Sequence, residues 1–102
     1  MPTVAEPDFV ARVDAVAATR AAEIARALAD PVRAQIFDVV RRHGGEICQC
    51  RLQPLFDISQ PTLSHHTRRL ADAGLIDVER RGRWAYYSVN PESLEEIRSW
   101  LS

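Results

Sequence analysis

Cys48 and Cys50, separated by one residue, are the two cysteines of this 102-residue chain. A close pair of soft thiolate donors suits As(III), Sb(III), Cd(II), Pb(II), Zn(II) or Cu(I). The neighbouring Arg51 and a nearby helix start favour the thiolate form. Residues so close in sequence are poorly placed for a disulfide, and a reducing compartment disfavours one further. We therefore interpret the pair as a metal or redox site.

A second set of polar side chains lies on one face of a helix that the pattern predicts between Ser59 and Gly74. Ser59 is a typical N-cap residue, and glycine commonly ends a helix. The polar face has no acid, and it carries Gln60, Pro61, Ser64, His65 and Arg68. Amide, hydroxyl, imidazole and guanidinium groups hydrogen-bond base edges and phosphates in a DNA major groove. The alternative is an ordinary solvated amphipathic helix.

The other face of this helix is predicted to pack on the scaffold through Leu63, His66, Thr67 and Leu70. Adjacent helical residues diverge by about 100°. We therefore expect His65 to face DNA and His66 to pack inward. Ser59 and Thr62, in the first turn, complete the candidate DNA-contact set on this helix.

An arginine-tipped hairpin is predicted directly after the helix. Leu75, Ile76 and Val78 are expected to begin one strand, and a second is expected at 84–89. Arg81, Gly82 and Arg83 form the tip, where Gly82 supplies a positive φ. Arg81 and Arg83 could reach phosphates or a neighbouring minor groove, which would make the hairpin a wing. The alternative is a solvated hairpin whose charges keep a sheet edge soluble.

The elements that position these residues are mostly helical. Residues 9–29 have no glycine or proline and are predicted to be helical, and Asp30-Pro31 starts a second helix that Gly44-Gly45 ends. A short helix over 51–56 and a turn over 57–59 then complete a helix-turn-helix pattern. Asn90-Pro91 caps a last helix.

Apolar stripes on the first and last helices are either core or subunit interface. Val10, Val13 and Val16 form a further apolar face near the start of the first helix. A chain this short has few elements against which to bury so many faces. We expect a homodimer that uses Ile24, Leu28, Leu94, Ile97, Trp100 and Leu101. Two-fold symmetry would present two recognition helices about 34–36 Å apart.

Length and composition fit a single domain over residues 1–102, with 1–8 as a flexible arm. The net charge is −1, but five arginines cluster within residues 68–83. No apolar run approaches the ~20 residues of a membrane span, and no secretory signal is visible, so we expect a cytoplasmic protein. The chain has no phosphate-binding glycine loop, paired catalytic carboxylates or nucleophile–base pair, so we expect no enzyme activity.

Four stretches together resemble the ArsR/SmtB family of winged helix-turn-helix repressors. They are ALADPVR at 27–33, EICQCRL at 46–52, SQPTLSHHTRRLADAGLI at 59–76 and RRGRWAYYSV at 80–89. The resemblance covers roughly three quarters of the chain, and its combination of SQPTxSHH with a preceding CxC is specific. It implies a mainly α fold with a β-hairpin, a homodimer, and double-stranded operator DNA as partner.

The resemblance also implies roles for particular residues. Family positions matching Gln60, Pro61, Ser64 and His65 approach DNA. Those matching Cys48 and Cys50 bind ligand in arsenic, cadmium and lead sensors, and ligand binding releases the operator. We rank As(III) or Sb(III) first as inducer and another thiophilic ion second, with no organic cofactor.

This chain departs from the family pattern in its number of sulfur ligands. Some arsenic sensors have a third cysteine where this chain has Gln53, and others use cysteines of an N-terminal arm, which has none here. Two thiolates plus hydroxide or an exogenous thiol could hold As(III). Zn(II) or Cd(II) would need added ligands, for which the candidates are His43, Glu46, Asp8 and Asp14. The last helix lacks histidine, so we predict no zinc at the family's second site.

Binding by both sulfurs constrains the backbone. Residues i and i+2 point about 200° apart in a helix but to one side in a strand, so joint binding demands extended or distorted backbone. Bound ligand would then bias the segment against its DNA-competent shape. The alternatives are oxidation of the same cysteines as a redox switch, two buried cysteines without ligand, or a winged-helix module that binds protein.

Overall fold

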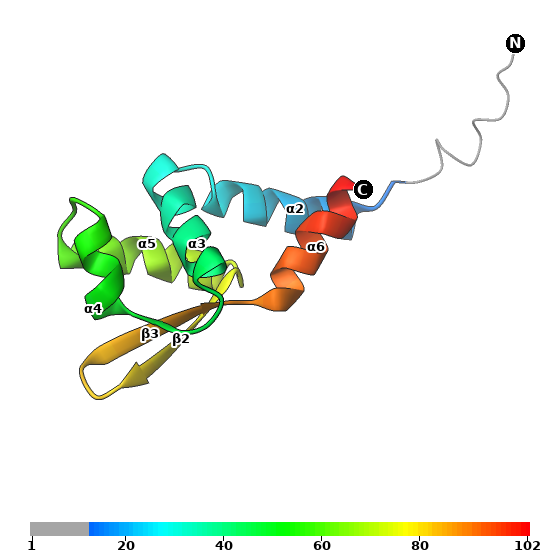
Figure 1. Cartoon of the computed structure of the whole chain (residues 1–102). Helices are drawn as coiled ribbons and strands as arrows, with labels where there is room; N and C mark the ends of the chain where they lie inside the picture. Colours follow the sequence, from blue (N-terminus) through cyan, green and yellow to red (C-terminus); the bar gives the residue numbers. More distant parts are fainter. Residues whose placement is uncertain (1–12) are drawn as a thin grey trace, which may run out of the picture.

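The computed structural model describes residues 13–102, and Figure 1 shows a helical body from which a hairpin projects. In chain order the elements are α2 (Ala15–Ala27), α3 (Pro31–His43), β1 (Ile47–Cys48), α4 (Gln49–Leu52), the 3-10 helix η1 (Gln53–Leu55), α5 (Gln60–Asp72), β2 (Ile76–Arg81), β3 (Trp84–Val89) and α6 (Pro91–Leu101). The predicted mainly α fold with a β-hairpin is confirmed.

Helix α2 leaves residues 13 and 14 of the helix predicted over 9–29 outside it. It starts at Ala15, because the Asp14 side chain caps it by accepting a hydrogen bond from the backbone N–H of Ala17 at 3.0 Å. Of the expected earlier part, Phe9 and Val10 lie outside the described residues, as do the arm over 1–8 and the candidate ligand Asp8.

The other helix starts confirm the capping pattern of the sequence. Asp30 accepts a hydrogen bond from the Arg33 N–H at 3.0 Å, and Asn90 accepts one from the Glu92 N–H at 2.9 Å. Each cap is followed by a proline in the first turn, where the backbone N–H that proline lacks would have no partner within the helix. Gly44 ends α3 with a φ of 75°, in the left-handed region that favours glycine.

The short helix differs from its prediction over 51–56. It begins at Gln49, where Cys48 is its N-cap, and it passes into η1 after Leu52. Pro54 explains the change, because it has no N–H to continue the α-helical ladder. The turn that follows leads to the N-cap Ser59, whose Oγ accepts from the Thr62 N–H at 3.3 Å.

The sheet has three antiparallel strands in the order β1-β3-β2. The predicted hairpin of β2 and β3 is confirmed, and Gly82 turns it with a φ of 63°. Arg81 belongs to β2, opposite Trp84, and does not lie in the turn. Strand β1 was not predicted; its two residues, Ile47 and Cys48, pair with Tyr87 and Tyr86 of β3.

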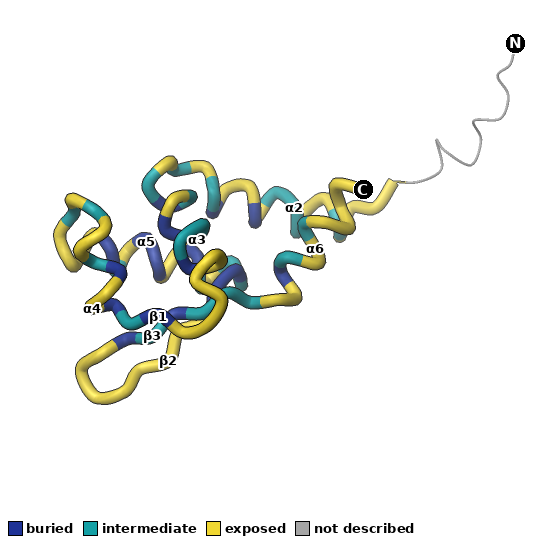
Figure 2. Tube along the Cα trace, viewed as in Figure 1, coloured by how far each residue is buried: buried dark blue, intermediate teal, exposed yellow. Residues whose placement is uncertain are grey.

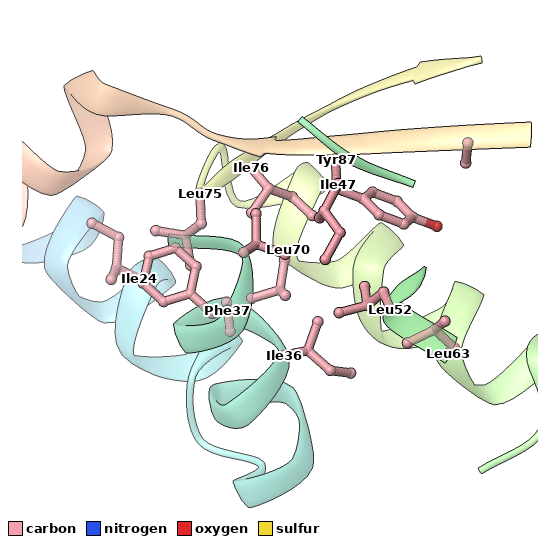
Figure 3. Close-up of a cluster of buried hydrophobic side chains, with 13 residues drawn as sticks. Ile24, Ile36, Phe37, Ile47, Leu52, Leu63, Leu70, Leu75, Ile76 and Tyr87 are labelled. Carbon is pink, nitrogen blue, oxygen red and sulfur yellow. The ribbon is translucent and has the colours of Figure 1, made fainter. Parts of the chain in front are cut away.

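The core lies between α3, α5 and the inner face of the sheet (Figure 3). Its fully buried side chains include Ile36, Val40, Leu52, Leu63, Leu70, Leu75 and Tyr87. Ile47 brings β1 into this cluster, which anchors the cysteine segment to the domain. Figure 2 shows the contrast with the hairpin tip, which is exposed throughout.

Helices α2 and α6 contact each other at the end of the molecule remote from the hairpin tip (Figure 1). Arg20 joins them: its guanidinium pairs with Glu96 at 3.1 Å and donates to the carbonyl of Ala73 at 2.7 Å. A groove of about 920 Å³ opens between the two helices. Within residues 13–102, none of the helices has both the length and the apolar character to cross a membrane.

Candidate nucleic-acid interface and cysteine pair

Helix α5 separates its two faces as predicted. The buried side consists of Leu63, His66, Thr67 and Leu70. Of the predicted DNA-contact residues on this helix, Ser64 is half-buried, and those left exposed are Ser59, Gln60, Pro61, Thr62, His65 and Arg68. The structure thus gathers the polar groups on one accessible surface, which starts at the helix N-terminus. Whether they contact DNA stays a prediction.

A buried arginine fixes the orientation of α5. Arg33 on α3 is 8% exposed, and its guanidinium donates to the backbone carbonyls of Ala27 and Arg26. Its Nη1 lies 3.3 Å from Nδ1 of His66. An arginine can only donate, so Nδ1 accepts, and the proton of the neutral imidazole is on Nε2. Burial lowers the pKa of His66, which favours this neutral form.

Arg33 was not predicted as a functional residue, although the sequence contains a signal for it. Arg33 precedes Ile36, Phe37 and Val40 at helical spacing, so it lies on the apolar face of α3. A charged residue on a buried stripe must find partners, because an unpaired buried charge is costly. Here the partners are the open carbonyls at the end of α2 and the ring of His66.

The two arginines expected at the wing tip differ in their surroundings. Arg83 is exposed, with its guanidinium carbon 5.5 Å from the centre of the Trp84 ring. Arg81 is held by carboxylates: its Nη2 lies 2.6 Å from Glu46 and 2.8 Å from Glu79. These hydrogen bonds raise the pKa of Arg81 and lower that of Glu79.

The cysteine pair lies where β1 ends and α4 begins. Cys48 has extended backbone angles and caps α4, with its sulfur accepting from the Cys50 N–H at 3.1 Å. Cys48 is half-buried and Cys50 is exposed. The structure joins the two sulfurs in a disulfide, so the expectation that geometry disfavours this bond is wrong. The bend between strand and helix brings the α-carbons to 5.1 Å and turns both side chains to one side.

Once the disulfide is reduced, two neighbouring sulfurs are available to a soft ion, and within residues 13–102 no third ligand lies beside them. Among residues 13–102, no group of three or more His, Cys, Asp or Glu side chains is placed to hold a metal. Asp14 caps α2, Glu46 pairs with Arg81, and His43 Nδ1 lies 3.4 Å from the Gly45 carbonyl. Gln53 donates to the Ile58 carbonyl at 2.6 Å. The described residues therefore offer fewer donors than a closed four-ligand Zn(II) site requires.

The residues expected at a dimer interface line the remote end of the molecule. Ile24 is buried in the chain's own core, and Leu28, Leu94 and Ile97 are half-buried against it. Trp100 and Leu101 are 58% and 71% exposed. Val13 and Val16, from the further apolar face of the first helix, are also exposed. Four exposed large apolar side chains thus lie on or next to α2 and α6, whereas Leu55, Val78 and Trp84 are exposed elsewhere.

Comparison with known proteins places this arrangement in a family. The model for "Bacterial regulatory protein, arsR family" matches residues 30–78. An "Arsenical resistance operon repressor" of Bacillus subtilis is 39% identical over 75 residues, which cover 72% of this chain and 70% of that protein. A protein of the same description from Staphylococcus xylosus is 40% identical over 78 residues, 76% of this chain and 73% of the relative.

A longer relative and two solved structures are also regulators of this kind. The chain spans 59% of the length of "Arsenic resistance transcriptional regulator ArsR1" of Pseudomonas putida, with 38% identity over 74% of its own length. The crystal structure of an ArsR family transcriptional regulator superposes with a TM-score of 0.72 at 28% identity, covering 81% of this chain and 84% of that one. That of a possible transcriptional regulator for arsenical resistance gives 0.67 at 28% identity, covering 78% and 79%. The chain therefore belongs to the ArsR family of bacterial helix-turn-helix regulatory proteins.

Proposed function

We propose that this repressor binds its operator as a homodimer and releases it when As(III) or Sb(III) binds to Cys48 and Cys50. The observation that carries the proposal is the placement of both sulfurs side by side at the start of α4. This helix is followed by η1, a short turn and then the recognition helix α5. Relatives described as arsenical resistance operon repressors support the choice of ion.

The DNA contact is assigned to α5 and the hairpin. The amide of Gln60 and the side chains of Ser64 and His65 would read base edges in the major groove. Arg68 would bind a phosphate, and Ser59, Pro61 and Thr62 would bring the positive helix N-terminus to the backbone. Arg83, exposed at the tip, would reach the adjacent phosphates or minor groove. Arg81 was expected to do the same, but its two carboxylate partners favour a different role.

A second copy of the chain is the proposed occupant of the groove between α2 and α6. Trp100 and Leu101 on α6 and Val16 on α2 are large apolar side chains left exposed at this groove. Clusters of this kind mark interaction surfaces. Two-fold pairing there would leave both hairpins and the N-terminal parts of both α5 helices free, because only the C-terminal end of α5 approaches α2 (Figure 1).

The cysteine pair couples to α5 through a short piece of backbone. Cys48 and Cys50 would hold the ion as thiolates, and the bend at Cys48 would have to adapt to it. Leu52, at the end of α4, is fully buried, so a movement of α4 is transmitted into the packing that positions α5. The coupling therefore has a physical route from the sulfurs to the DNA-contact face.

The DNA assignment is tested by anisotropy of a labelled palindromic operator. Gln60→Ala, Ser64→Ala and Arg83→Ala, alone and combined, should weaken binding, by about 1–3 kcal/mol for a side chain that reads a base. Gln35→Ala is a control, since Gln35 is an exposed amide on α3. Unchanged affinity in the triple variant would remove the DNA-contact assignment.

The ligand assignment is tested without DNA. Protein reduced and kept anaerobic is incubated with arsenite, antimonite, cadmium, lead, zinc or copper(I), desalted, and analysed for bound element. We expect about one arsenic or antimony per chain in the wild type and none in Cys48→Ser or Cys50→Ser. Retention of arsenic by both variants would show that the ion binds elsewhere.

Thiol oxidation is a second candidate signal, favoured by the disulfide in the structure. The two thiols would lose two protons and two electrons to a peroxide, which is reduced with them to two waters, and the disulfide would form. Mass spectrometry after peroxide should then show a loss of two hydrogens per chain, together with operator release. Release by arsenite but not by peroxide would exclude this signal.

A further inference from the structure

A row of side chains crosses the outer face of the sheet beside the cysteine pair. Cys48 of β1 is the register partner of Tyr86 on β3, and Tyr86 is the partner of Glu79 on β2. Opposed residues of neighbouring strands project to the same face. The guanidinium of Arg81 lies over the Tyr86 ring, 4.4 Å from its centre. The half-buried cysteine, the aromatic ring and the arginine therefore share one surface.

The pair of Glu46 and Arg81 spans this surface. Glu46 immediately precedes β1, and Arg81 ends β2, so their 2.6 Å contact bridges two strands that are not neighbours. Glu46 lies two residues before Cys48, whereas Arg81 is next to the Gly82–Arg83 tip. The contact is therefore a direct link between the cysteine segment and the wing, defined as the hairpin of β2 and β3.

We propose that Glu46 and Arg81 form a latch that makes the orientation of the wing depend on the state of the cysteine pair. This inference rests on the proposed function and makes both side chains positioning residues for ligand-controlled DNA binding. Any change in the spacing of the two sulfurs moves the backbone at Cys48. That backbone also carries Glu46, so the change reaches Arg81 and the wing tip. The route is separate from that through α4 to α5.

The surroundings of Arg81 favour positioning over stability or direct DNA contact. Arg81 and Glu46 are 45% and 42% exposed, and exposed ion pairs contribute little to folding. The carboxylates of Glu46 and Glu79 and the ring of Tyr86 nevertheless hold the Arg81 guanidinium in place, so it is less able to move toward a DNA phosphate. A well-ordered pair with little effect on stability is suited to transmit a displacement.

The two tryptophans allow the wing to be observed directly. Labelling with 5-fluorotryptophan gives two ¹⁹F resonances, from Trp84 and Trp100. Trp84 is the register partner of Arg81, and Trp100 lies on α6 as an internal reference. Spectra of the reduced protein are compared with those after arsenite and after diamide, which takes two electrons and two protons from the two thiols. We expect the Trp84 resonance to shift in the wild type.

Glu46→Gln and Glu79→Gln are matched variants. Each removes one carboxylate bonded to Arg81 and changes the charge equally, but Glu79 lies on β2 with Arg81 and leaves the link to Glu46 intact. Glu46→Gln should lose most of the Trp84 shift, and Glu79→Gln should keep it. In an Arg81→Gln background, Glu46→Gln should have no further effect. The arsenite-induced fall in operator affinity should shrink about 2- to 30-fold in Glu46→Gln, as for one residue of a coupling network.

The outcomes separate the latch from the proposed function. A Trp84 shift that is absent in the wild type, or equal in Glu46→Gln and the wild type, overturns the latch, even if arsenite still releases the operator. A Glu46-dependent Trp84 shift without operator release supports the latch and removes the proposed function. A Glu46-dependent shift together with release supports both.

Discussion

Arg33 of α3 and His66 of α5 meet inside the domain, with Nη1 of the guanidinium 3.3 Å from Nδ1 of the imidazole. The contact requires a neutral histidine, because a protonated ring would direct an N–H at a cation. It joins the two helices on which the DNA-contact face depends. The protonation of one buried ring is therefore linked to the integrity of the interface.

Stability should fall when the pH drops below the ordinary histidine value. Burial lowers the pKa of His66 from 6.5; Asp30 opposes the shift, whereas Arg33 and His65 add to it. As the pH falls, the unfolded chain therefore binds the proton before the folded chain does. The contribution of neutral His66 to the free energy of unfolding is complete above about pH 6.5, and it is lost as the pH falls through the lower pKa of the folded state. Urea unfolding on both sides of this pH measures the effect. His66→Gln should reduce the pH dependence and His65→Gln should keep it; equal behaviour of the two variants would contradict the assignment.

Gly82→Ala should destabilise the wing through the backbone alone. Gly82 has a φ of 63°, and an added Cβ would meet nothing within 4 Å, so the left-handed conformation is the source of the cost, about 1–2 kcal/mol. Gly45→Ala is the control, because Gly45 is equally open and has no positive φ. Urea unfolding and operator anisotropy should both show a loss for Gly82→Ala alone. Equal losses in both variants would point to a side-chain effect.

Trp100→Glu should convert the proposed dimer to monomers. A charge placed at the groove between α2 and α6 would have to be desolvated on pairing, which is costly. Leu55→Glu is the matched control, since Leu55 is 60% exposed on η1, away from this groove. Sedimentation should give a monomer for Trp100→Glu and a dimer for the wild type and Leu55→Glu. If the wild type sediments as a monomer, the proposed dimer is ruled out.

Arg68→Ala should reduce the salt dependence of operator binding by about one unit of slope, as expected for one lost phosphate contact. Arg69→Ala is the control on the same helix: it removes the same charge, but the residue lies about 100° further around α5. Anisotropy titrations over a range of salt concentrations give the slopes. Equal changes in both variants would indicate a general charge effect.

Local signals made much of the fold predictable from the sequence. Asp30-Pro31, Ser59 and Asn90 caps depend only on residues within the next turn, and their helices start where predicted. The hairpin follows from Gly82 and the alternation around it. The polar face of α5 follows from helical periodicity, which the burial of Leu63, His66 and Leu70 confirms.

The features that were missed depend on contacts between distant residues. Strand β1 is two residues long, and it exists because Ile47 and Cys48 pair with β3. The Glu46–Arg81 contact joins positions 35 residues apart, for which neither spacing nor composition gives a signal. The sulfur–sulfur bond depends on the bend between β1 and α4, which spacing alone does not reveal.

The proposed control of DNA binding by two sulfurs is tested by operator affinity measured with and without arsenite. Reduced wild-type protein should bind a labelled operator, and arsenite should weaken this binding by about 5- to 150-fold, the usual range of allosteric coupling. Cys48→Ser and Cys50→Ser should bind the operator as the wild type does, and arsenite should leave their operator affinity unchanged. Equal release in the wild type and both serine variants, or no release in any of them, would show that Cys48 and Cys50 do not control operator binding.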